Sequence, residues 1–184
     1  WGSDERGQIG DGNWTVRTTP TEAVLTGVDA IAAGGEHTCA VMSTGGARCW
    51  GRNSENQLGD GTATSISIAP TTDTLENVRA IAAGHGHTCA LMNSDGVRCW
   101  GSLIYGPIGD SIRWNVSSPP LTDSLTGVQA ITAREGHTCA LMAAGGVRCW
   151  GINEQGQLGD GTTTNSVEPP QEDVLAGVQA VETA

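Results

Sequence analysis

Apolar and polar positions along the chain follow a pattern that returns every 50 residues. Short alternating runs stand at residues 28–33 (VDAIAA), 78–83 (VRAIAA) and 128–133 (VQAITA). An alternation of period two is typical of a β-strand with one buried face. A longer motif follows each run, at residues 37–51 (HTCAVMSTGGARCWG), 87–101 (HTCALMNSDGVRCWG) and 137–151 (HTCALMAAGGVRCWG). Two apolar stretches around a turn near Thr44 predict a β-hairpin in each copy.

Polar, glycine-containing stretches follow the hairpins. Residues 1–12 (WGSDERGQIGDG), 50–61 (WGRNSENQLGDG) and 150–161 (WGINEQGQLGDG) share one pattern. Their Gly, Asn and Asp residues favour turns, so we interpret them as loops that leave a strand. Asn53, Glu55 and Asp60 offer oxygens for calcium, but the EF-hand order of ligands is absent and a turn is favoured. A Thr- and Pro-containing connection then leads to the next alternating run.

Each unit therefore contains three or four short strands and no convincing helix. A period of about 50 residues with this strand content predicts all-β propeller blades. The units are approximately residues 1–50, 51–100, 101–150 and 151–184, the last of them incomplete. We treat residues 1–184 as one partial propeller of about three and a half repeats.

Composition and charge exclude several classes of function. The chain has no Phe, 27 Gly and a formal net charge of −11. Nucleic-acid binding rests largely on Lys and Arg that neutralise phosphates, so this surface argues against it. Negative charge also disfavours anionic membranes, and no apolar run reaches the roughly 18 residues of a spanning helix. We expect neither nucleic-acid binding nor membrane insertion.

Six cysteines form three pairs with nine residues between partners. A hairpin would place Cys39 opposite Cys49, a geometry that suits a disulfide, and the same holds for Cys89 with Cys99 and Cys139 with Cys149. A metal site is the alternative, although each repeat supplies only three ligands, and free buried thiols are another. Disulfides would indicate a secreted or cell-surface protein, and the sequons at Asn13 and Asn115 are compatible with export and glycosylation.

The repeated motif resembles the regulator-of-chromosome-condensation repeat. Ten residues of one unit stand in the order of that motif: Gly34, His37, Thr38, Ala40, Gly46, Trp50, Gly51, Gln57, Leu58 and Gly59. The resemblance implies a β-propeller of seven blades, of which this chain would form part, either in one ring or in a larger assembly. Proteins with that fold include exchange factors for a small nuclear GTPase, a plant ultraviolet-B photoreceptor and secreted inhibitors of β-lactamase. The resemblance therefore implies a fold but not one particular function for this chain. The presence of cysteine in both hairpin strands makes the repeat similar to that of the extracellular members of this family.

Residues that could perform chemistry recur with the repeat, which argues against catalysis, because an active site is a single constellation. We interpret three histidines as core residues whose ring nitrogens bond to backbone groups, and three tryptophans as core. Each repeated arginine should lie over a Trp face or pair with an acidic residue of the adjoining blade. These residues are His37, His87, His137, Trp50, Trp100, Trp150, Arg48, Arg98 and Arg148. We therefore predict no enzyme, no cofactor and no metal.

Residues that do not repeat are the candidates for an interface. Trp14 and Trp114 lie in connections where other repeats have Thr, and Leu103 and Tyr105 lie in a stretch that departs from its siblings. Aromatic residues in surface loops often anchor interfaces, whereas drift in a tolerant loop is the alternative. His85 and Arg134 are also singular, at turns where polar residues usually indicate only solvation.

The two ends of the repeat pattern predict assembly. The first residues of the sequence correspond to the part of a repeat just after a hairpin, and residues 178–181 correspond to the part just before the next hairpin would begin. An open array of three blades would expose two apolar faces, so we expect either a longer parent chain or copies that meet in a ring or filament. The function predicted is a non-enzymatic extracellular scaffold with a structural, adhesive or self-assembling role. The alternatives are a secreted inhibitor of the β-lactamase-inhibitor type and an exchange-factor-like propeller, against which the cysteines count.

Overall fold

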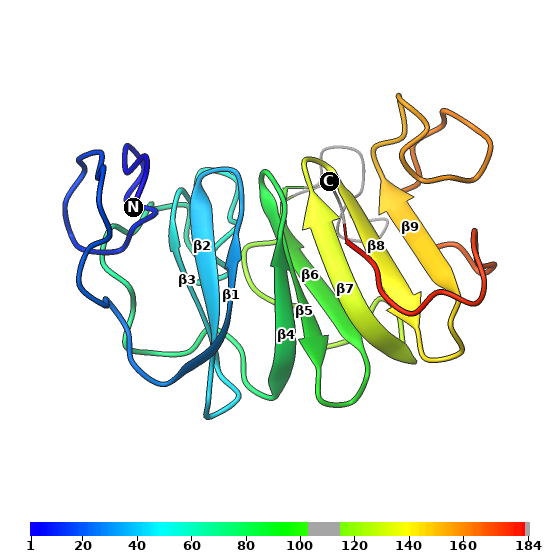
Figure 1. Ribbon diagram of the computed structural model, residues 1–184, viewed down its shortest axis with the longest axis horizontal. Coiled ribbons are helices and arrows are strands. Elements are labelled where there is room, and N and C mark those ends of the chain that lie inside the picture. Colours follow the sequence, from blue (N-terminus) through cyan, green and yellow to red (C-terminus); the bar gives the residue numbers. More distant parts are fainter. Residues whose placement is uncertain (103–114, 183–184) are drawn as a thin grey trace.

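Three small antiparallel sheets stand side by side in the computed structural model, which describes residues 1–102 and 115–182 (Figure 1). Each sheet has three strands in sequence order, and we call the sheets blades 1, 2 and 3. The strands are β1 (Val28–Ala33), β2 (His37–Met42), β3 (Ala47–Gly51), β4 (Val78–Ala83), β5 (His87–Met92), β6 (Val97–Gly101), β7 (Val128–Arg134), β8 (His137–Met142) and β9 (Val147–Gly151). The alternating runs predicted as strands are confirmed, with β7 one residue longer.

The second and third strands of each blade form the predicted hairpin. In blade 1, Cys39 lies opposite Cys49 and Thr38 opposite Trp50. The turn between them needs a residue with positive φ, and Gly45 supplies it with φ of 83°. The same register returns in blades 2 and 3. The 50-residue period of the sequence is therefore a period of backbone geometry as well.

A broken fourth strand closes the outer edge of each blade. The connection after β3 runs antiparallel to it and bonds at two points, Gly51 with Ile66 and Ala47 with Leu75. Equivalent bridges join β6 and β9 to their own connections. The sequence prediction of three or four strands per unit thus corresponds to three continuous strands and one interrupted strand. Among the described residues no helix is long and apolar enough to span a membrane.

The core lies between consecutive blades. Trp100 of blade 2 is fully buried and packs with Cys39, Cys49 and Leu58 of the preceding unit. Trp150 of blade 3 packs with Cys89 and Cys99 in the same way. The blades therefore stack face to face as propeller blades do, and the tryptophan of one blade covers the disulfide of the blade before it.

Candidate functional site

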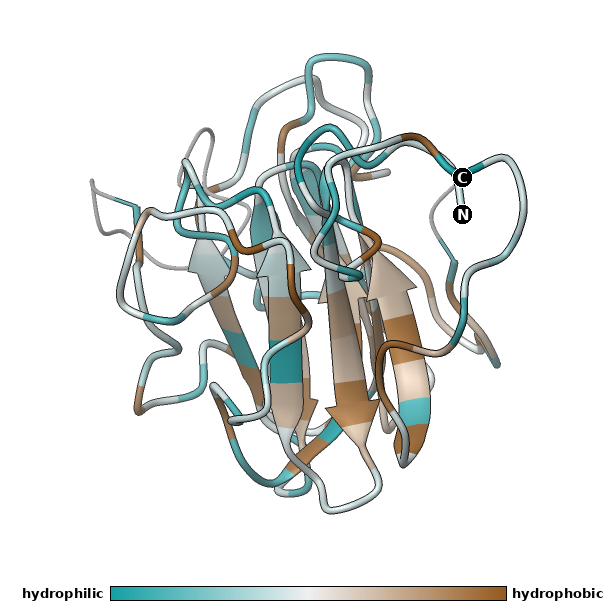
Figure 2. Cartoon of the chain, turned by 90° about the vertical axis from the view of Figure 1, so that its left-hand side faces the viewer, coloured by the Kyte–Doolittle hydropathy of each residue, from teal (hydrophilic) through white to brown (hydrophobic). Residues whose placement is uncertain are grey.

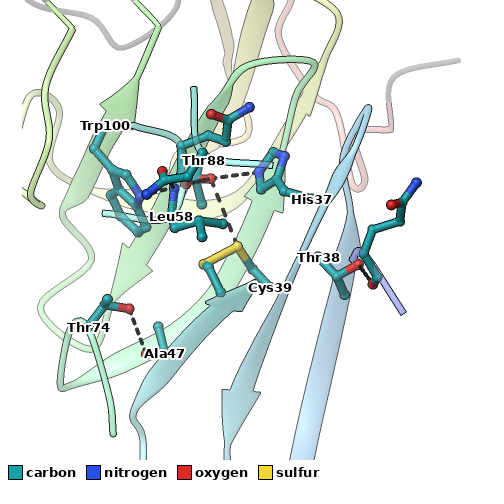
Figure 3. The surroundings of a disulfide bond; sticks show 12 residues. His37, Thr38, Cys39, Ala47, Leu58, Thr74, Thr88 and Trp100 are labelled. Carbon is teal, nitrogen blue, oxygen red and sulfur yellow. Dashed lines mark hydrogen bonds between the residues drawn. A yellow bond between two sulfur atoms is a disulfide. The ribbon is translucent and has the colours of Figure 1, made fainter. Parts of the chain in front are cut away.

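A side-chain hydrogen bond joins the hairpin histidine of blades 1 and 2 to the next blade, and Figure 3 shows the bond of His37. His37 Nε2 lies 2.9 Å from Thr88 Oγ1, and His87 Nε2 lies 3.0 Å from Thr138 Oγ1. His37 and His87 are core residues as predicted, whereas His137 is only partly buried. The prediction of backbone partners is wrong for the Nε2 atoms of His37 and His87, which bond to a hydroxyl instead. The reason is strand alternation, because His and Thr are adjacent and therefore face opposite neighbouring blades.

The direction of this bond follows from the third member of the joint. The Thr88 hydroxyl donates to the Gln57 carbonyl oxygen at 2.8 Å, so its oxygen accepts from His37 Nε2–H. Burial lowers the pKa of His37 to about 4 and that of His87 to about 3, with nearby positive charge as the smaller cause. Both rings are therefore neutral at pH 7, and acid–base catalysis in the neutral range is not available to them.

Disulfides close all three hairpins. Cys39–Cys49, Cys89–Cys99 and Cys139–Cys149 are bonded, each with Cα atoms 4.1 Å apart. No cysteine is free, so the sulfur atoms are not available as thiolate ligands for a metal. In Figure 3 the Cys39 sulfur lies beside Thr88 and Leu58, within the joint itself. In blades 1 and 2 the bridge therefore links its two strands where the next blade packs on them.

The repeated arginines form ion pairs with the connections that lead to the next blade. Arg48 Nε lies 2.6 Å from Asp73 Oδ1, and the equivalent pairs Arg98–Asp123 and Arg148–Asp173 measure 2.7 Å. Pairing with an acidic residue was one of the two predicted arrangements and is observed, but the aspartate borders the arginine's own blade and not the adjoining one. The aspartate also lies against the glycine of the hairpin turn, where a Cβ on Gly46 would overlap it. These arginines are therefore structural.

The loop considered as a calcium site is a self-contained turn. Asn53 is fully buried, and its Nδ2 donates to Asp60 Oδ1 at 3.0 Å while its Oδ1 accepts from the Leu58 amide. Glu55 pairs with Arg52 at 2.9 Å instead of pointing to the same place. The oxygens of this loop accept hydrogen bonds from the Asn53 amide nitrogen, and Asn153 repeats the arrangement. Sequence reasoning missed this role, although the repetition of Asn53 at Asn153 signals it.

Turns from all three blades meet where the first strand of each blade passes into the second. They line an open cavity of about 290 Å³ that includes His85, Arg134 and Glu135. Backbone bonds join the turns, from Gly35 N to Gly84 O and from His85 N to Glu135 O. His85 and Arg134, which the sequence analysis assigned only to solvation, are therefore brought together by the stacking of the blades.

The predicted interface residues have different outcomes. Trp14 is 51% exposed, and Asn13 beside it is exposed. Asn115 is exposed as well. Leu103, Tyr105 and Trp114 lie outside the described residues. Trp14 thus stays a candidate contact residue, and both asparagine side chains are on the surface.

A larger apolar hollow lies on the outer face of blade 1. It has a volume of about 660 Å³ and is bounded by the segment before β1 and by the sheet itself. Val28 is 39% exposed there, whereas Val78 and Val128 at the same place in the next blades are 2% and 0% exposed. We call this hollow the blade 1 slot; its apolar lining includes Trp1, Ile9, Leu25, Val28, Ile31 and Trp50.

Comparison with known families and structures agrees with this geometry. The family model described as the regulator of chromosome condensation (RCC1) repeat matches residues 28–57, 78–102 and 128–157. These three stretches match the RCC1 repeat. Each match begins at the first strand of a blade and extends past the hairpin, so the RCC1 motif coincides with one blade. No curated protein matches the chain by sequence.

Solved structures, yeast RCC1 among them, have the same fold. Human WBSCR16 is 26% identical, with a TM-score of 0.79 over 91% of this chain and 46% of its own. Yeast RCC1 (Prp20) bound to Kap60 is 22% identical, with a TM-score of 0.78 over 92% of this chain and 43% of its own. A second structure, of Saccharomyces cerevisiae Prp20p, is 21% identical, with a TM-score of 0.77 over 92% of this chain and 44% of its own. The chain spans less than half the length of these structures.

Proposed function

We propose that the chain is a non-enzymatic, extracellular propeller module that serves as a scaffold for protein binding and self-association. The observation that carries the proposal is the blade 1 slot, where Ile31 is 67% exposed beside Val28. Figure 2 looks onto this end of the row and shows apolar segments on the strands amid mostly polar connections. A contiguous apolar hollow with a polar rim is typical of a surface that binds protein.

The repetition of the buried polar groups supports a non-enzymatic role. His37 and His87 each bond to a threonine of the next blade, and the arginines each bond to an aspartate. Each of these roles is one that a blade needs for stability, and none is unique to one place. A catalytic centre would instead need a single group of residues with distinct roles.

The disulfides support an extracellular location. All six cysteines are paired and buried. Cytosolic and nuclear thiols stay reduced, so in those compartments the blades would lose their covalent links. Relatives of the fold support protein binding in general, since yeast RCC1 was solved bound to Kap60 and Prp20p is described as binding Gsp1p and histones.

Sedimentation velocity of the 184-residue chain over a wide concentration range tests self-association. We expect species heavier than the 18.9 kDa of one chain, with Trp14→Ala weakening the association because Trp14 is an exposed aromatic side chain. Thr64→Ala, at the matching place of the next repeat, is the control and should leave the distribution unchanged. A single 18.9 kDa species at every concentration would refute self-association.

A further inference from the structure

Two loops of the chain follow the same backbone path. We call residues 2–17 loop 1 and residues 51–66 loop 2, and each is closed by two backbone bonds of 2.7 and 2.9 Å between its first and last residues. The turn bonds inside the loops coincide position by position, and so do the positive φ angles, which are 81° at Gly12 and 80° at Gly61. Loop 1 is the blue segment near the N-terminal end in Figure 1. The two loops therefore differ in their side chains.

A buried amide forms the centre of loop 2. The Oδ1 atom of Asn53 accepts from the Leu58 amide, while its Nδ2 lies 3.0–3.3 Å from four oxygen atoms. Asn153 makes the same contacts in the loop after β9, at 3.1–3.2 Å. These oxygens can stay close together because an N–H donor lies between them. In loop 2 they are Asp60 Oδ1, Thr62 O, Thr62 Oγ1 and Thr64 O.

Asp4 takes the place of this asparagine in loop 1. Its Oδ1 accepts from the Ile9 amide at 2.8 Å, so its Oδ2 has the position of the donor nitrogen. Asp4 is 0% exposed, and its Oδ2 has no hydrogen-bond partner among the described residues. In loop 2 the partners of Nδ2 stand 7, 9 and 11 residues after Asn53. Their counterparts in loop 1, at positions 11, 13 and 15, all belong to the described chain, so the change from amide to carboxylate is what leaves Oδ2 unpaired.

The groups that surround Asp4 Oδ2 are hydrogen-bond acceptors. Asp11 Oδ1 accepts from the Asn13 amide at 2.9 Å, as the equivalent aspartate of loop 2 does from Thr62, so the two carboxylates have the same orientation. Arg17 pairs with the other oxygen of Asp11, at 2.9 Å. The matching backbone adds the carbonyl oxygens of residues 13 and 15. A buried carboxylate among acceptors is unfavourable unless a positive charge or a donor compensates it.

We propose that loop 1 binds a calcium ion at Asp4, with Asp11 and the carbonyl oxygens of Asn13 and Thr15 as further ligands. Calcium prefers carboxylate and carbonyl oxygens, and oxygens about 2.3–2.6 Å from one ion stand about 3 Å apart, close to the spacing found in loop 2. Magnesium demands near-ideal octahedral geometry at a shorter distance, which suits fixed backbone carbonyls less well. Sequence repetition predicted no metal, because the residues that recur serve every blade. Asp4 stands where the repeat changes.

The ligands also determine the expected affinity. In the part of the chain that the structure describes, no third His, Cys, Asp or Glu joins the two carboxylates in a group that could hold a metal. Calcium affinity depends on the charge of the ligands, so the dissociation constant should be on the order of 10⁻⁴–10⁻³ M. Calcium at about ten times that constant should raise the melting temperature by about 3–6 °C.

Thermal unfolding of the 184-residue chain over a calcium titration tests the site, with magnesium at the same concentrations as the comparison. The rise should be saturable with calcium and smaller with magnesium. Terbium, an ion of similar size to calcium, gives a direct measurement of binding, because a nearby tryptophan excites its luminescence. Trp14 follows Asn13 in loop 1, and calcium should displace the bound terbium.

Asp4→Asn is the decisive variant, because it gives loop 1 the amide that forms the centre of loop 2. Without calcium the variant should melt at a higher temperature than the unchanged chain, since Nδ2 can donate to the surrounding oxygens. It should lose the response to calcium and the terbium luminescence. Asp29→Asn is the control: it removes the same charge from an exposed position in β1 and should keep both responses.

Four results would overturn the proposal. The first is the absence of a saturable calcium response in the unchanged chain, which a buried water molecule at Asp4 Oδ2 in place of the ion would produce. The second is a calcium response that persists in Asp4→Asn. The third is an equal loss of the response in Asp29→Asn, which would indicate an effect of overall charge. The fourth is an equal response to magnesium, which would refute a site of calcium geometry.

Discussion

Replacing His87 with alanine is the sharpest test of the joint between blades. The ring is 1% exposed, and its Nε2 bonds to Thr138 at 3.0 Å. His87→Ala removes this bond, worth about 1 kcal/mol, and leaves a cavity in place of the imidazole. Together these terms predict a loss of about 2–4 kcal/mol in the free energy of unfolding. For a chain of this size that corresponds to a melting temperature lower by roughly 5–15 °C.

His137→Ala is the matched control in the same chain. His137 heads the last hairpin, is only partly buried, and has no following blade in the described structure to supply a threonine. Its replacement should cost about 1 kcal/mol or less, since it breaks no hydrogen bond to a following blade and a partly buried ring leaves a smaller cavity. Thermal unfolding followed by near-ultraviolet circular dichroism measures both variants. Equal melting temperatures for the two variants would refute the structural role assigned to the buried histidine.

Three further predictions concern pH, the disulfides and a glycine. Burial lowers the pKa of His37 to about 4 and that of His87 to about 3, so as the pH falls the unfolded chain binds protons before the folded chain does. The free energy of unfolding should therefore be constant above pH 6.5 and fall by about 1.4 kcal/mol per pH unit for each ring between pH 6.5 and 4. Urea titrations at several pH values measure this slope, which should be smaller for the His37→Ala variant. Replacing Cys89 and Cys99 with alanine should lower the free energy of unfolding by about 3 kcal/mol in the chain-entropy model, and an unchanged urea midpoint would contradict it. Gly59→Ala should destabilise more than Gly159→Ala, because a Cβ on Gly59 would lie 2.5 Å from the Trp100 indole whereas Gly159 has no neighbour within 4 Å; similar losses for both would point to strain from their positive φ alone.

The local structure of each blade could be predicted from the sequence because it depends on short-range patterns. Period-two alternation located β1, β4 and β7, and the glycine turn between two apolar stretches located the hairpins. Cysteine spacing predicted the disulfides, since a hairpin register places Cys39 opposite Cys49 regardless of what surrounds it. The acidic partner of the repeated arginines was one of two predicted arrangements, and the structure selects it.

Contacts between blades were decided only by the tertiary structure, because they join residues about 50 positions apart. No local pattern reveals that the Thr88 hydroxyl, rather than a backbone group, accepts from His37. The cavity near His85 and Arg134 likewise exists only because three turns stack. Repetition in the sequence showed that the hairpin histidine and threonine have a role in every blade. The stacking of one sheet on the next determined which residues they contact, because in a repeat protein the core lies between units.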